Sequence, residues 1–246
     1  MYKNVSLFIC LLLLLSLTGC SNYAILTGKV IDASGDPISE LKIIANPIIK
    51  NKKNKQVFVM TGLDGTFEIK KLGPSAEYTL KPFSKSWDTK NMTLDVKTAQ
   101  AGKTSALPRP IVFRYKVDYR NIITDSLTGL EWYAYGSNGK DLDWKDSEKW
   151  AIGLDKKLYG FGKWRMPTVE ELKSLYDENI DSEYKIDPIF KLNSCCVWSG
   201  EKIDTSKANS FSYKPGIREM GNLNNRYMNR AFAVSVRSST SKDENK

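Results

Sequence analysis

Apolar and polar residues alternate along the chain between residues 25 and 98, at the two-residue period of a β-strand. The alternating runs are 25–31, 41–45, 56–60, 66–69, 78–80 and 93–96. Turn-forming residues separate them, and Asp64-Gly65 supplies the positive φ angles of a tight hairpin between two of these runs. The pattern predicts an all-β sandwich over residues 25–98.

The pattern of apolar and polar residues changes after residue 98. Residues 99–110 are small, polar and proline-bearing, which predicts a linker. Residues 111–237 mix strand-like runs at 111–115 and 231–237 with two helical patterns, so this part is predicted to be α+β. Asp143 is the predicted cap of the first helix, with Gly160 as its stop. Thr168-Val169-Glu170-Glu171 is a capping box that starts the second helix, and residues 238–246 are predicted to be a disordered tail.

The amino terminus carries a targeting signal. Lys3 precedes an apolar run at 7–17 that is too short to cross a bilayer, which needs about 20 residues. Leu17-Thr18-Gly19-Cys20 resembles the lipobox of bacterial lipoproteins. The resemblance implies a signal peptide at 1–19, lipidation of Cys20 and a lipidated tether at 20–24, and Ser21 implies an outer-membrane address. The alternative is an ordinary secretory signal followed by an unmodified cysteine.

Charge and composition limit the classes of function that this chain can have. The chain has 37 Lys and Arg against 28 Asp and Glu, a net charge of +9 that becomes +8 when Lys3 leaves with the signal peptide. A cationic surface favours phospholipid headgroups, lipopolysaccharide, sulfated glycans or nucleic acid, although solubility alone also explains it. There is no histidine, which removes the commonest general base and the commonest zinc ligand. We therefore expect no enzyme activity, no cofactor and no metal.

Two clusters are candidates for binding an anionic ligand. One is the dense basic loop of Lys50, Lys52, Lys53 and Lys55, which a solvated hairpin tip also explains. The other is the set of Arg218, Arg226 and Arg230 in an asparagine-rich stretch, which is thin evidence for nucleic acid but suits an anionic glycan.

Three further groups have structural explanations that we prefer. Asp141, Asp143 and Asp146 lack EF-hand spacing, so helix capping accounts for them better than calcium binding. Tryptophans 132, 144, 164 and 198 are expected to build the core of the second domain rather than stack on a ligand. Cys195 and Cys196 are adjacent and could close only a strained ring, so we expect them to stay free, pair between chains or form a labile switch.

The first domain carries motifs of a known family. Residues 28–32, 35–38 and 61–67 (GKVID, GDPI and TGLDGTF) resemble the carboxypeptidase regulatory-like domain over about residues 25–81. The resemblance implies a transthyretin- or immunoglobulin-like sandwich that serves as a non-catalytic spacer.

Four segments of the second domain together resemble the Lcl C-terminal domain of bacterial surface proteins, from about Tyr115 to Arg237. They are residues 124–132, 164–172, 197–199 and 233–237. The resemblance implies a fold similar to C-type lectins and formylglycine-generating enzymes, and a surface role, because the namesake adhesin's domain binds sulfated glycosaminoglycans. Family members often carry cysteines in the first helix and the final strand, where this chain has none and Ser235, respectively.

These observations predict a lipid-anchored, non-enzymatic envelope protein, on the periplasmic face or the cell surface, that binds anionic glycans or a protein partner and no nucleic acid. A structural or protein-interaction lipoprotein without a soluble ligand is the alternative. A lectin-like enzyme related to formylglycine-generating enzymes ranks third, because it would need a reactive thiol at Cys195 or Cys196.

Overall fold

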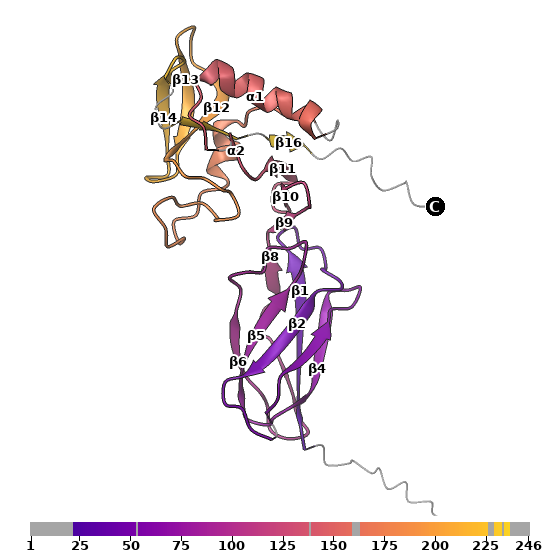
Figure 1. Ribbon diagram of the computed structural model, residues 1–246. Helices are drawn as coiled ribbons and strands as arrows, with labels where there is room; N and C mark the ends of the chain where they lie inside the picture. Colours follow the sequence, from indigo (N-terminus) through magenta and orange to yellow (C-terminus); the bar gives the residue numbers. More distant parts are fainter. Residues whose placement is uncertain are drawn as a thin grey trace, which may run out of the picture.

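The structure is a computed structural model that describes residues 22–52, 54–137, 139–158, 163–225, 229–232 and 234–236. The predicted signal peptide, Cys20, Gly160 and the predicted tail at 238–246 lie outside the described residues. Two β-rich parts are stacked end to end (Figure 1). We call residues 22–113 the stalk and residues 114–236 the head. None of the helices in the described ranges has the length and apolarity needed to cross a bilayer.

The stalk contains two four-stranded sheets that face each other (Figure 1). The first sheet consists of β1 (Ala24–Asp32), β4 (Thr66–Leu72), β7 (Thr104–Ala106) and β8 (Ile111–Phe113). In it β1 pairs antiparallel with β4 and parallel with both β7 and β8. The second sheet has the order β3 (Val57–Met60), β2 (Lys42–Pro47), β5 (Glu77–Phe83) and β6 (Leu94–Lys97), and all its pairs are antiparallel.

The stalk core confirms the alternating pattern. Every second residue of β1, β2 and β5 points inward, so Leu26, Ile43 and Leu80 are fully buried while their neighbours are more exposed. Burying each such side chain contributes about 1.5–3 kcal/mol. Gly28 is required by close packing, since a Cβ atom there would lie 2.4 Å from the ring of Phe67. The sequence therefore predicted the sandwich-like, β-rich character of this part correctly.

Three details of the prediction were wrong. Gly65 has the positive φ of 75° that its turn needs, but β3 and β4 belong to different sheets, so the turn joins two sheets instead of closing a hairpin. The predicted linker 99–110 contains β7, and the predicted second domain begins with β8, yet both strands pair with β1 of the stalk. Ala24, placed in the tether, is buried in β1. These errors share one cause, because pairing with β1 is a tertiary contact that short segments do not reveal.

The head also contains two four-stranded sheets, together with two helices. The first sheet has the order β16 (Val234–Val236), β11 (Leu130–Tyr133), β10 (Ile122–Asp125) and β9 (Tyr115–Val117). The second has the order β14 (Ile217–Asn222), β13 (Lys207–Ser212), β12 (Cys196–Lys202) and β15 (Asn229–Ala231). The strands predicted at 111–115 and 231–237 are each split, and the halves join different sheets.

The two helices begin where the sequence predicted. Asp143 caps α1 (Trp144–Lys157) by accepting a hydrogen bond from the backbone N–H of Asp146, at 2.8 Å. Thr168 and Glu171 form the complete capping box of α2 (Val169–Lys173). Capping therefore explains Asp143, as predicted, and no group of three metal-ligating side chains occurs among the described residues.

Aromatic side chains fill the head core. Trp132 and Trp198 are fully buried, and Trp144 and Trp164 are only 4% exposed. The indole N–H groups of Trp144 and Trp198 donate to the backbone carbonyls of Ser199 and Leu142, at 2.8 and 3.0 Å. The predicted structural role of the four tryptophans is confirmed, because all four rings are buried in the core and are therefore unavailable for stacking on a ligand.

Candidate functional site

The predicted basic loop lies at the end of the stalk that is remote from the head. Lys50, Lys52 and Lys55 are exposed in the connection from β2 to β3, and we call these three residues the lysine loop. Lys53 lies outside the described residues. Asn54 shapes the connection, since its backbone N–H donates to Oδ1 of Asn51 at 2.8 Å. The lysine side chains therefore project from a turn fixed by its own asparagines.

The predicted arginine cluster lies in the head. Arg218 is on β14, and its Nε donates to Oδ1 of Asn209 at 3.0 Å. Arg226 lies outside the described residues, and Arg230 belongs to β15 but its side chain is likewise not described. Arg218 and the lysine loop are on different domains, at separate ends of the molecule (Figure 1). The described members of the two predicted clusters therefore do not form one binding surface.

The sequence prediction missed a row of lysines on the outer face of α1. Lys145, Lys149 and Lys156 are exposed and are spaced by four and seven residues, which puts them on one face of the helix. We call these three residues the α1 stripe. Ile152, on the same face, is 58% exposed. The spacing of these lysines is visible in the sequence, but it marks one face only once the segment is known to be a helix.

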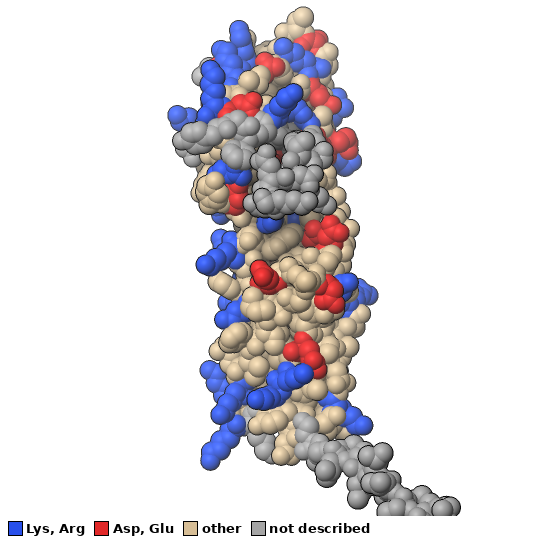
Figure 2. All heavy atoms as spheres, turned by 90° about the vertical axis from the view of Figure 1, so that its right-hand side faces the viewer, with Lys and Arg blue, Asp and Glu red and all other residues tan. Residues whose placement is uncertain are grey.

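The α1 stripe lies at the other end of the molecule from the lysine loop. α1 packs on the part of the head that is remote from the stalk (Figure 1). On the face drawn in Figure 2, Lys and Arg side chains gather at the lower end of the stalk and over the upper end of the head. The lysine loop and the α1 stripe are therefore two separate groups of exposed lysines, and other cationic side chains lie between them.

The net charge is divided unequally between the two parts. Residues 21–113 carry 14 Lys and Arg against 8 Asp and Glu, a net charge of +6. Residues 114–246 carry 22 against 20, a net charge of +2. Attraction of an anion to the head therefore depends on where its lysines lie and not on its total charge.

A largely buried ion pair lies within the head, next to its junction with the stalk. Nε and Nη2 of Arg114 donate to the two carboxylate oxygens of Asp125, at 2.8 and 2.7 Å. Nη2 of Arg114 also donates to the carbonyl of Ser174, at 2.9 Å. Burial, the largest single influence, would lower the pKa of Arg114, but the hydrogen bond to the fully buried Asp125 and the attraction of nearby anionic groups together outweigh it and raise that pKa.

The same aspartate organises the turn that the sequence predicted at residues 125–129. Asp125 accepts hydrogen bonds from the backbone N–H of Leu127 and the hydroxyl of Thr128, and Gly129 has a φ of 71°. Ser126 reaches the stalk, where its hydroxyl accepts a hydrogen bond from the backbone N–H of Ala33 at 3.1 Å. This motif is therefore a structural connection between the two parts.

A hollow of about 320 Å³ lies at the junction, with walls from both parts. Asp88 from the stalk and Asp177 and Asp187 from the head line it, together with Arg114. Burial raises the pKa of Asp187, and repulsion from Asp88 adds to the effect. Because three of its charged groups are acidic, the hollow does not suit an anionic ligand.

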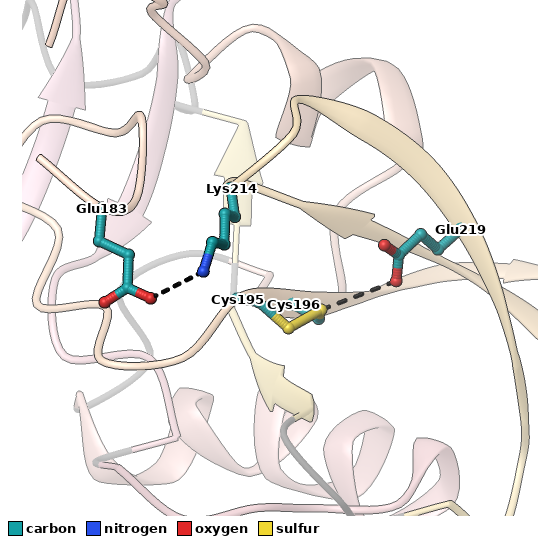
Figure 3. The surroundings of a disulfide bond; sticks show 5 residues. All are labelled: Glu183, Cys195, Cys196, Lys214 and Glu219. Atoms are coloured by element: carbon teal, nitrogen blue, oxygen red, sulfur yellow. Dashed lines mark hydrogen bonds and ion pairs between the residues drawn. A yellow bond between two sulfur atoms is a disulfide. The ribbon is translucent and has the colours of Figure 1, made fainter.

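Cys195 and Cys196 are joined by a disulfide at the start of β12 (Figure 3). Sγ of Cys196 lies 3.7 Å from a carboxylate oxygen of Glu219 on the neighbouring part of the sheet, and an exposed Lys214–Glu183 ion pair lies beside the bond. The expectation that these cysteines stay free or pair between chains is wrong for this structure. In this state neither sulfur is a free thiol.

The comparisons with known proteins identify one of the two parts. Residues 121–237 match the family model of the Lcl C-terminal domain, which confirms the predicted resemblance over that range. One of four matching solved chains is a DUF3823 family protein from Bacteroides ovatus, with 16% identity and a TM-score of 0.30. The match covers 44% of this chain and 61% of that protein, and so low a TM-score supports no conclusion. No curated protein matches.

Proposed function

We propose, on the premise that residues 121–237 form an Lcl C-terminal domain, that they are the binding head of a lipid-anchored, non-enzymatic envelope protein. In this proposal Cys20 carries the acyl chains, the protein has no catalytic role, and the stalk is a carboxypeptidase regulatory-like spacer. The head would have a C-type-lectin-like arrangement and bind anionic glycans. The outer membrane is the proposed location, on the evidence of Ser21.

One observation carries the proposal. β1 begins at Ala24, only four residues after Cys20, at the end of the stalk remote from the head (Figure 1). An anchor at Cys20 would therefore hold the stalk end at the membrane and direct the head away from it. A spacer with a binding domain at its far end is the arrangement that a surface-binding protein requires.

The α1 stripe supplies the chemistry for an anionic glycan. Its lysines extend over eleven residues of helix, about 16 Å, so they present repeated positive charges along a line. A polymer with repeated sulfate or carboxylate groups would contact several of them together. Lys149 has only an exposed partner, Asp146 at 3.7 Å, and such a pair competes weakly with a ligand.

Heparin affinity chromatography of the mature chain tests the proposal. A variant with Lys145→Gln, Lys149→Gln and Lys156→Gln should elute at clearly lower salt than the unmodified protein. The matched control removes the same charge from the lysine loop, by Lys50→Gln, Lys52→Gln and Lys55→Gln, and should lose less retention. Retention no stronger than that of a neutral protein would contradict the proposal. Equal losses in both variants would show that net charge alone drives retention.

The small net charge of the head favours a second candidate, an envelope lipoprotein that binds another protein and no soluble glycan. This candidate predicts no heparin retention that depends on the α1 stripe. It also predicts that crosslinking in intact cells captures one protein partner through the head.

A further inference from the structure

The end of the stalk where the chain emerges carries more than the lysine loop. Four segments meet there through backbone hydrogen bonds. Gly102 donates to the carbonyl of Tyr23 at 2.9 Å, and Ile48 donates to that of Glu77 at 3.0 Å. Glu77 is paired with Lys97 in the ladder between β5 and β6. The start of β1, the connection from β2 to β3, and the two turns beside them therefore form one continuous surface.

Exposed apolar side chains lie within this surface. Ile49 is 72% exposed, Ile48 is 52% exposed and Tyr23 is 41% exposed. Pro47, the last residue of β2, has a buried side chain, whereas Ile48 and Ile49 directly after it are both exposed. A protein gains nothing in water by presenting two adjacent isoleucines and a tyrosine at one tip.

Lysines lie at the same end of the stalk as these apolar residues. Lys97 and Lys103 are exposed at the same end and add to the lysine loop. Glu77 is an exposed acidic group among them, opposite Lys97. We call the five lysines, together with Tyr23, Ile48 and Ile49, the stalk-end surface. Exposed apolar side chains together with lysines match the chemistry of a membrane interface, where the apolar groups enter the headgroup region and the lysines contact phosphates.

We propose that the stalk-end surface docks onto the anionic phospholipid headgroups of the leaflet that holds the acyl chains. This inference rests on the proposed lipidation of Cys20. Asn22 is two positions after Cys20, so the chain between them spans at most about 7 Å when fully extended. This span is close to the electrostatic screening length of about 8 Å at physiological salt. An acylated Cys20 would therefore hold this end of the stalk close enough for its lysines to interact with the headgroup charges.

The proposal assigns the lysine loop a different partner from the α1 stripe. The lysine loop faces the anchoring membrane, and the α1 stripe faces the ligand of the head. Docking at three or more points would also orient the stalk, because a single flexible tether leaves the tilt of a protein free.

Amine labelling of the acylated full-length protein tests the inference without any substitution. The protein is reconstituted into neutral phosphatidylcholine vesicles, or into vesicles with about 30 mol% phosphatidylglycerol, and acetylated with an amine-reactive ester. Peptide mass spectrometry then gives the labelling rate of each lysine. The lysine loop should react about threefold or more slowly on the anionic vesicles than on the neutral ones, and about 0.5 M salt should remove the difference. The α1 stripe should react equally on both.

Equal rates for the lysine loop on both vesicles would overturn the inference, and so would equal slowing of the α1 stripe. Flotation of the vesicles reports separately on the anchor. Protein that fails to float contradicts the proposed lipidation, whereas protein that floats with unprotected lysines contradicts only membrane docking. Ile49→Ser should weaken the protection of Lys50, while Leu63→Ser, at an 89% exposed position elsewhere in the stalk, should leave it unchanged.

Discussion

The stalk and the head contain equal numbers of described sheets, but different physical features hold them together. The stalk is two facing sheets whose aliphatic side chains alternate inward and outward, such as Leu26 and Leu80. The head relies on large aromatic rings, including Trp132 and Phe190, which meet edge to face at 6.0 Å. Regular alternation can be recognised in a sequence, whereas an aromatic core assembled from strands, helices and loops is recognised mainly through its motifs.

Charge separates the two parts as well. The stalk has most of the net positive charge, and the head has nearly balanced charges with three lysines aligned on α1. The net charge of the whole chain therefore does not show how charge is distributed in the stalk or in the head. The proposed difference between the cationic stalk-end surface and the α1 stripe can be tested. The stability of the stalk core and that of the head core can also be tested separately.

The largest expected effect is on the head core. Trp198→Ala removes a fully buried ring and should lower the free energy of unfolding of the head by about 3–5 kcal/mol. Five of the six tryptophans lie in the head, so denaturation followed by tryptophan fluorescence reports mainly on it. Far-ultraviolet circular dichroism follows both parts. The control Leu63→Ala, at an exposed position, should change neither transition. An equal loss of stalk stability in Trp198→Ala would show that the two cores unfold as one.

The largely buried ion pair at the base of the head should be nearly as sensitive. Asp125→Ala leaves Arg114 without its buried carboxylate and should cost about 3 kcal/mol in unfolding free energy. The comparison variant is Glu68→Gln, which breaks an exposed pair with Lys70 and should cost less than about 1 kcal/mol. Urea denaturation measures both. Similar losses in the two variants would contradict the structural role of the Arg114–Asp125 pair.

A smaller effect should depend on pH. Burial tends to raise the pKa of Glu171, but hydrogen bonds from Arg165 and Thr168 outweigh it and lower that pKa below the ordinary 4.5. The ionised carboxylate therefore stabilises the head above pH 4.5, and this stabilisation is lost as the pH falls through the lowered pKa. Glu171→Gln should cost about 1 kcal/mol at neutral pH and progressively less in acid.

The control for this pH dependence is Glu170→Gln, an exposed position in the same helical turn. Unfolding free energies of the three proteins would be measured from neutral pH down to about pH 3. A difference between Glu171→Gln and the unmodified protein that stayed constant over this range would refute the assigned cause.

The disulfide between adjacent cysteines should contribute least. It closes a loop of only two residues, so it restricts the unfolded chain little and should add about 1 kcal/mol. Reduction of the unmodified protein should shift its urea midpoint slightly, and the double variant Cys195→Ser, Cys196→Ser should not respond to reductant. Unfolding of the head upon reduction would show that this bond has a larger role.

Local features of both parts were predictable from the sequence because they depend on neighbouring residues. The caps at Asp143 and Thr168 and the turn at Asp125 need only a few consecutive residues. Pairing of β8 with β1 joins residues about 80 positions apart, so no local pattern marks it. The hydrogen bond between Ser126 and Ala33 depends on the same kind of long-range contact, because these residues are 93 positions apart.

The candidate binding residues were only partly predictable for a related reason. A run such as the lysine loop stands out in a sequence, but its distance from Arg218 depends on the fold. The α1 stripe was overlooked because its lysines are separated by unrelated residues and align only on a helix.

The central claim is that the chain is held at a membrane through Cys20, and intact mass spectrometry of the protein isolated from its native envelope tests it most directly. The account predicts a mature chain that begins at Cys20 and carries the mass of its acyl chains. A chain that retains Met1, or a soluble protein with an unmodified Cys20, would contradict it.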